Sequence, residues 1–151
     1  IFKINMLQRI QSIFLFLAGG ASFGVLGLPF ATTETSQAKS ELFADSIFNT
    51  QDNIALMIFF GIAGLLAIVD IFMYNNRPLQ IRLGMFAFIA NVIGLILGIF
   101  LFFNDVPSIN TDNIDDGLGT YLPIVAGILL LLAIRFIRKD EKLVRSADRL
   151  R

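Results

Sequence analysis

Cysteine, histidine and tryptophan are all absent from the 151 residues of the chain. Without cysteine and histidine the chain can form no disulfide, no thiolate or imidazole metal site and no histidine-ligated haem. Nucleophilic catalysis by a Cys–His pair or a Ser–His–Asp triad is excluded for the same reason. We therefore expect a protein that is not an enzyme and that holds no cofactor or metal.

Charged residues are also scarce, at 16% of the chain, whereas hydrophobic residues make up 56%. Both values lie far from those of soluble domains. The net charge of zero gives no general attraction to nucleic acid, and no basic face accompanies the sixteen phenylalanines. Several apolar runs reach about 20 residues, the length that crosses a hydrocarbon core of about 30 Å. These features predict a single integral membrane domain with no nucleic-acid partner.

A short polar stretch, residues 74–82, separates two of the long apolar runs. It contains Arg77, Pro78 and Arg82. Two arginines cannot continue a helix inside lipid, and the proline removes a backbone donor and disfavours helical conformation at the residue before it. We therefore expect a tight turn here between two membrane helices.

The other apolar runs complete an all-α membrane protein, an antiparallel four-helix transmembrane bundle with a helical C-terminal extension. The basic start and the first apolar run are also typical of a signal peptide, but a run of about 20 residues favours an uncleaved first helix. In the extension, Glu141 and Arg145 have the i,i+4 spacing of a helical ion pair. The expected helices span 10–30, 54–73, 83–103 and 118–137, the outer loops 31–53 and 104–117, and the tail 138–151.

The first outer loop contains two pairs of apolar residues at near-helical spacing, Leu42 with Phe43 and Ile47 with Phe48. They are compatible with one face of a short interfacial helix, but packing on the ends of the bundle is the favoured interpretation, because such pairs need only a surface to cover. Both outer loops are acidic, with adjacent aspartates at 115–116. Such loops form either a solvated acidic surface or a weak Ca²⁺ site.

Basic residues are distributed very unevenly along the chain. Eleven of the twelve lysines and arginines lie at the N-terminus, in the 74–82 turn or from residue 135 onward, and only Lys39 lies in an outer loop. Short cytoplasmic segments of membrane proteins carry this excess of positive charge. The bias predicts a multi-pass membrane protein with both termini and the turn in the cytoplasm.

Two polar side chains interrupt the apolar runs. Asp70 is the one ionisable residue inside a run, and a charge in such a place is a candidate functional group. Because it lies about one helical turn from the end of its run, Arg77, Arg82 or Arg135 could form an ion pair with it. A proton- or ion-handling site and a contact to a partner subunit remain as alternatives. Asn91, the deepest polar residue, predicts an interhelical hydrogen bond.

The tail places a cluster of basic residues directly after the last apolar run. Anionic lipid headgroups attract such residues by about 1 kcal/mol each near the surface. The cluster therefore predicts either contact with anionic headgroups at the cytoplasmic face or docking of another protein subunit. Its members are Arg135, Arg138, Lys139, Lys142, Arg145 and Arg149.

Three segments carry a resemblance to a known family: Met6–Ser12, Arg77–Arg82 and, most specifically, Ile137–Arg151. Together they resemble an uncharacterised family of small four-helix inner-membrane proteins from Bacteroidota, catalogued as a domain of unknown function. The resemblance covers the whole chain. It implies a four-helix inner-membrane protein whose usual start is Met6, and it brings no activity, catalytic residue or cofactor.

The leading functional hypothesis is a non-catalytic accessory or scaffold subunit of a larger bacterial inner-membrane complex. It follows from the missing reactive clusters together with the specific polar stretches at the cytoplasmic face. The alternative is a small oligomeric channel or transporter that uses Asp70 and Asn91 as intramembrane polar groups, although these are few and no helix is clearly broken. A lipid-facing enzyme ranks third, because such chemistry needs convergent acids, bases or metal ligands.

Overall fold

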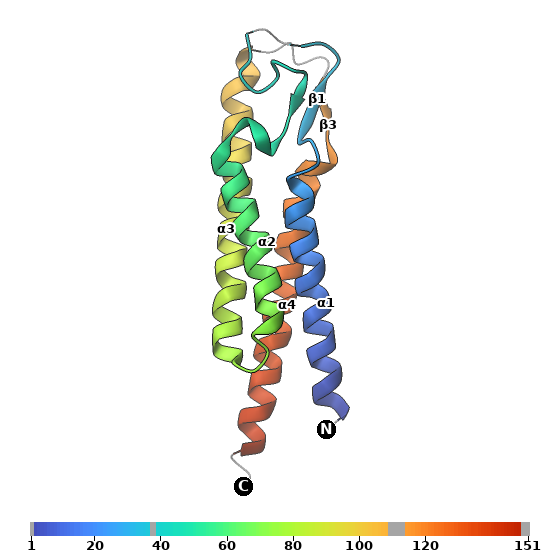
Figure 1. Ribbon diagram of the computed structural model, residues 1–151, viewed down its shortest axis with the longest axis vertical. Coiled ribbons are helices and arrows are strands. Elements are labelled where there is room, and N and C mark those ends of the chain that lie inside the picture. Colours follow the sequence, from blue (N-terminus) through green and yellow to red (C-terminus); the bar gives the residue numbers. More distant parts are fainter. Residues whose placement is uncertain (1, 37–38, 109–113, 149–151) are drawn as a thin grey trace.

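The apolar runs of the sequence fold into four long helices that lie side by side along one axis (Figure 1). The computed structural model describes residues 2–36, 39–108 and 114–148. Consecutive helices are antiparallel neighbours, and α1 also packs against α4, so that the four enclose a common interior. The predicted fold class, an all-α four-helix bundle, is confirmed. The helices are α1 (Phe2–Val25), α2 (Ile54–Phe72), α3 (Arg77–Asp105) and α4 (Leu118–Asp148).

The helix boundaries differ from the predicted ones at the turn between α2 and α3. The turn is shorter than 74–82, because α3 begins at Arg77 and not at residue 83. The Asn76 side chain accepts a hydrogen bond from the Leu79 amide at 3.2 Å and so caps the helix. Pro78 then lies in the first turn, where its missing N–H costs nothing. Arg82 is therefore a helical residue.

The end of α1 differs from expectation, whereas α4 confirms the predicted helical extension. The first helix ends at Val25, and not at residue 30, because the chain closes tight turns through Gly27 and then meets Pro29. Helix α4 runs without a break from Leu118 to Asp148, so the predicted tail at 138–151 is its continuation as far as it is described. The expected pair between Arg145 and Glu141 is formed, at 2.7 Å.

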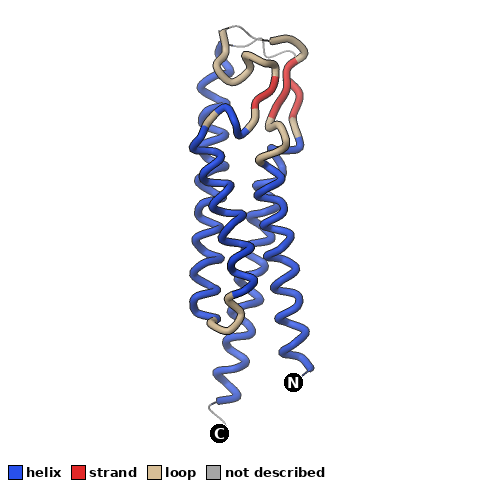
Figure 2. The backbone as a smooth tube through the Cα atoms, in the orientation of Figure 1, coloured by secondary structure: helices blue, strands red, loops and turns tan. Residues whose placement is uncertain are grey.

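A small antiparallel sheet caps one end of the bundle, which we call the strand end; the opposite end is the turn end (Figure 2). Strand β1 (Ala31–Thr33) lies between β2 (Ile47–Phe48) and β3 (Ile114–Asp116), with Ala31 opposite both Phe48 and Asp116. Two short 3₁₀ turns, η1 (Thr50–Asp52) and η2 (Val106–Ser108), flank helices α2 and α3.

Residues 42–48 form no interfacial helix, and the favoured prediction, packing on the end of the bundle, is confirmed. Leu42, Phe43 and Phe48 are buried at the strand end, whereas Ile47 is partly exposed. The Phe30 amide donates to the Phe48 carbonyl at 2.7 Å. The backbone groups of this segment therefore find hydrogen-bond partners by pairing with the chain at β1, and no helix is needed to supply them. The buried rings belong to a hydrophobic core at the strand end. This core contains Val25, Phe30, Ala31, Leu42, Phe43, Phe48, Leu56 and Phe60.

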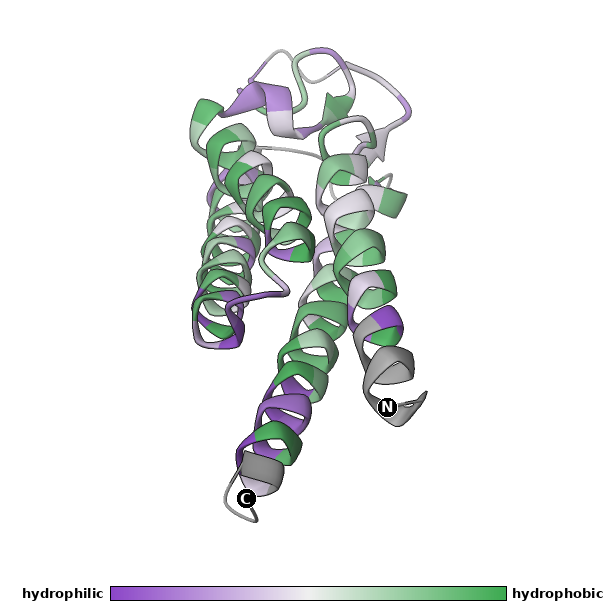
Figure 3. Ribbon diagram, turned by 60° about the horizontal axis from the view of Figure 1, so that its bottom comes forward, coloured by the Kyte–Doolittle hydropathy of each residue, from purple (hydrophilic) through white to green (hydrophobic). Residues whose placement is uncertain are grey.

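A second core lies nearer the turn end, and it consists largely of small and aliphatic residues. Small side chains let the four helices approach closely. Many large apolar side chains are exposed on the outside of the helices, and most of the helical ribbon is green, hydrophobic, in Figure 3. Three helical stretches, Ile54–Phe72, Arg77–Asp105 and Leu118–Ser146, are long and apolar enough to cross a membrane, and the apolar stretch Arg9–Val25 of α1 is shorter. The second core contains Leu15, Ala18, Ala67, Ala87, Leu130, Ala133 and Ile137.

Replacing Gly117 by alanine should destabilise the strand end. A Cβ atom there would lie 2.1 Å from the Pro29 carbonyl oxygen, which is backbone and cannot swing away. We expect a loss of about 1–3 kcal/mol in the free energy of unfolding, as for other overpacked sites. Thermal unfolding in detergent, followed by circular dichroism, measures it. The control is Gly20→Ala, where no atom lies within 4 Å of the new Cβ; equal midpoints for both variants would contradict the close approach.

Candidate functional site

The turn end of the bundle contains a layer of buried polar side chains. Gln11, Asp70, Gln80 and Asp140 come from α1, α2, α3 and α4 in turn, and each is at most 3% exposed. Arg77, at the start of α3, joins them. We call these five residues the polar layer. Polar groups buried among apolar helices require partners within the protein, so the contacts of each decide what the layer can do.

Neighbouring contacts show that these residues lie at similar heights in the bundle. The rings of Phe14 and Phe136 stack at 5.5 Å, so these two residues of α1 and α4 lie at the same height. Gln11 and Asp140 each lie about one helical turn from them toward the turn end. Gly84 lies against both Ile134 and the Asp70 carboxylate, which sets the height of α2 and α3. The layer therefore spans about 10 Å along the bundle axis at 1.5 Å per residue.

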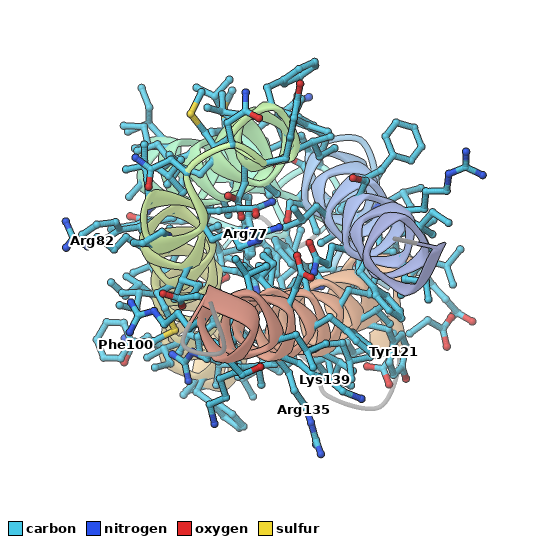
Figure 4. All side chains as sticks on the ribbon, turned by 90° about the horizontal axis from the view of Figure 1, so that it is seen from below. Arg77, Arg82, Phe100, Tyr121, Arg135 and Lys139 are labelled. Carbon is cyan, nitrogen blue, oxygen red and sulfur yellow. The ribbon has the colours of Figure 1, made fainter. Side chains whose placement is uncertain are left out.

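The central contact of the polar layer is an ion pair between α3 and α4. The Arg77 Nε atom donates to the Asp140 Oδ2 atom at 2.9 Å. Asp140 is 2% exposed and Arg77 28%, so the pair is largely removed from water. Figure 4, seen from the turn end, shows Arg77 directed into the space between the helices, whereas Arg82 and Arg135 are directed away from the bundle. A half-buried pair of this kind fixes the two helices in register.

Asp70 is fully buried, and neither of its carboxylate oxygens has a hydrogen-bond partner among the described residues. The predicted ion pair with Arg77, Arg82 or Arg135 is therefore wrong. Arg77 binds Asp140 instead, and the other two side chains lie outside the bundle. The Asp70 backbone carbonyl is used, since it accepts from the Gln80 Nε2 atom at 3.2 Å. This contact ties the end of α2 to the first turns of α3.

Asn91 forms the interhelical hydrogen bond that the sequence predicts. Its Nδ2 atom donates to the Pro123 carbonyl oxygen at 2.8 Å, which links α3 to α4. Asn91 lies seven residues from Gly84, or about 10 Å nearer the strand end than Asp70. Apolar residues such as Ala87 and Leu130 fill the interior at intermediate height. The structure therefore does not bring Asn91 and Asp70 together into one site.

The basic cluster of the tail divides into two groups. Arg135, Arg138, Lys139 and Lys142 line a groove on the outside of the bundle between α4 and α3. Arg145 is turned to Glu141, and Arg149 lies outside the described residues. Within residues 2–36, 39–108 and 114–148, no three acidic residues come close enough to hold a metal ion.

Sequence reasoning missed Gln11, Gln80 and Asp140. A signal for Asp140 was present, because Leu130, Ala133, Ile137 and Asp140 follow one another at helical spacing on a single buried stripe of α4. The acid continues an apolar stripe and so belongs to the interior. Gln80 carries a weaker signal, three residues after Arg77 on the same helix.

Comparison with known proteins gives one match. The model of a family described as "Domain of unknown function (DUF4293)" matches residues 7–150. The predicted membership of an uncharacterised family is thereby confirmed. Neither the curated proteins nor the solved structures contain a match.

Breaking the buried ion pair should cost more stability than breaking the exposed one. Arg77→Gln leaves the Asp140 carboxylate buried without its cation, and we expect a loss of about 3 kcal/mol. Arg145→Gln removes a pair in which the arginine is 74% exposed, and its effect should stay near about 0.5 kcal/mol. Chemical or thermal unfolding in detergent measures both. The double variant Arg77→Met with Asp140→Leu should recover most of the loss, because no charge is then left buried; a double variant as unstable as the single one would contradict this account.

Proposed function

The chain belongs to the DUF4293 family, and on that premise we propose that it is a non-catalytic accessory or scaffold subunit of a larger bacterial inner-membrane complex. The proposal is supported by what the bundle presents to its surroundings. Three of its helices are long and apolar enough to cross a membrane, its interior is packed, and its polar surface is concentrated at the two ends. Such a molecule is built to hold other subunits.

The observation that carries the proposal is the extension of α4. In Figure 1 this helix continues past the turn between α2 and α3. From Asp140 to Asp148 it adds about 12 Å of helix at 1.5 Å per residue. The buried pair between Arg77 and Asp140 anchors the base of this arm to the bundle. A helix held in this way presents its exposed side chains, among them Lys142 and Arg145, at a fixed height and direction for a partner.

The packed interior supports a scaffold more than a pathway through one chain. Between the polar layer and the strand end, the core is filled mainly by apolar side chains; Asn91 is bonded to the backbone of α4, and Ser22 of α1 is also buried. Gly19, Gly64 and Gly94 lie so close to side chains of neighbouring helices that an added Cβ would meet them at about 3 Å or less. Helices packed this closely leave little room for a pathway lined by polar groups within the described part of the chain.

The alternative function is a small oligomeric channel or transporter. One observation favours it, namely the fully buried Asp70 carboxylate without a hydrogen-bond partner in the described residues. A group of this kind within a membrane segment is a candidate for handling protons or ions. In an oligomer it would act together with Asn91, which lies on a different helix and at a different height.

The accessory role predicts stoichiometric partners. Purified from its own host in mild detergent through an N-terminal tag, the protein should bring a fixed set of larger membrane subunits, identified by mass spectrometry. Lys142→Glu with Arg145→Glu should lower the yield of that set by several-fold, while Arg9→Glu, on α1, should not. A monomer or homo-oligomer without partners would contradict the accessory role; proton flux into liposomes, lost in Asp70→Asn, would then support the alternative.

The proposed orientation places the turn end in the cytoplasm, in agreement with the excess of basic residues there. Because the chain has no cysteine, single cysteines report sidedness without background. In spheroplasts a membrane-impermeant maleimide should label Glu34→Cys, beside β1, and should label Arg145→Cys only after the membrane is opened. Labelling of Arg145→Cys in intact spheroplasts would reverse the orientation.

A further inference from the structure

A groove runs along the outside of the bundle between α3 and α4 at the turn end. Its volume is about 600 Å³. Met85 on α3 and Leu131 and Ile134 on α4 form its apolar part. Its basic part comes from α4 alone and consists of Arg135, Arg138, Lys139 and Lys142. In Figure 3 the purple, hydrophilic part of α4 follows directly on its green part, so the groove crosses from apolar to basic surface.

The spacing of the basic residues places them on one side of the helix. Residues 135, 138, 139 and 142 recur at three and four positions, which is the repeat of a helix face. Ile134, the residue before the first of them, ends the apolar run of α4. In a membrane the four cations would therefore lie where the hydrocarbon meets the headgroups, with the apolar part of the groove beside the acyl chains.

No carboxylate neutralises the four groove cations within the part of the chain that the structure describes. The acids of the same helix segment are used elsewhere, since Asp140 binds Arg77 in the interior and Glu141 binds Arg145. Among these cations, Arg138 makes a contact to sulfur, from its Nη2 atom to the Met85 Sδ atom at 3.8 Å. This contact holds the guanidinium over the apolar part of the groove.

We propose that this groove binds an anionic phospholipid. The phosphate lies among Arg135, Arg138, Lys139 and Lys142, and an acyl chain lies along Met85 and Leu131. Guanidinium and ammonium groups are the usual ligands of a phosphate, and basic pockets between membrane helices select acidic headgroups. The proposal is a defined site, in contrast to diffuse attraction of the whole tail. It rests on the bundle lying in a membrane and does not depend on the accessory role.

Because the chain has no tryptophan, a single one at the groove reports on the lipid beside it. Leu131→Trp places the indole at a side chain that is 48% exposed. The protein is reconstituted in phosphatidylcholine vesicles that contain brominated phosphatidylglycerol, or brominated phosphatidylcholine at the same mole fraction. Bromine quenches an indole that it contacts. We expect the anionic lipid to quench at least about five-fold more effectively, the factor that one cation near an acidic surface supplies.

The matched control for position is Leu65→Trp on α2, a residue that is 57% exposed. Ile134 and Asp70 both lie against Gly84. Leu131 precedes Ile134 by three residues and Leu65 precedes Asp70 by five, each toward the strand end, so the two positions have similar depths. At Leu65→Trp the two brominated lipids should quench equally, because helix α2 (Ile54–Phe72) contains no lysine or arginine.

The matched control for charge compares two pairs of substitutions in the Leu131→Trp background. Arg138→Gln with Lys142→Gln should lower the preference for the anionic lipid by about five-fold or more. Arg9→Gln with Arg82→Gln removes two exposed cations from other helices at the same end and should leave it unchanged. Equal loss in both pairs would show diffuse attraction and overturn the site. Equal quenching by the two lipids, or an indole that neither quenches because another chain covers it, would overturn it as well.

Discussion

The ion pair between Arg77 and Asp140 is the contact on which the turn end of the molecule depends. It is possible only because the turn between α2 and α3 is short, with Asn76 as the cap and Arg77 as the first helical residue. A helix that began at residue 83 would leave the guanidinium in a loop. Since a buried carboxylate without a cation is costly, the pair fixes the start of α3, the height of α4 and the direction in which α4 leaves the bundle.

The hydropathy of the sequence was sufficient to predict the four helices and their antiparallel order, because lipid admits little else for a chain of this composition. It was insufficient for the sheet. Strands of two and three residues show no alternating pattern, and β1 pairs with β3 across more than 80 residues. The start of α3 was missed for a different reason: Pro78 marks a break in most contexts and a first turn in this one.

The sequence predicted the interhelical hydrogen bond of Asn91 correctly and the ion pair of Asp70 wrongly, because different properties determine the two contacts. Asn91 lies deep in its apolar run and donates to the backbone carbonyl of Pro123, so its depth alone identified its role. For Asp70 the sequence offers three candidate cations near the same end of the bundle. The direction in which each side chain leaves its helix decides whether it reaches the carboxylate. Arg77 faces inward to Asp140, and Arg82 faces outward. Charge spacing therefore predicted the end of the bundle at which the polar groups gather and not their pairing.

Helix α4 performs two tasks because its opposite faces differ. Asp140 continues the buried stripe, while its neighbour Lys139 and Lys142 belong to the exposed groove. Successive residues of a helix are rotated by about 100°. Adjacent residues of opposite charge can therefore face the interior and the exterior of the bundle without forming an ion pair with each other. This separation explains why a tail rich in arginine and lysine keeps unpaired cations on its surface although acids lie beside them in sequence. The interior pair holds the helix in place, and the exterior charges remain available.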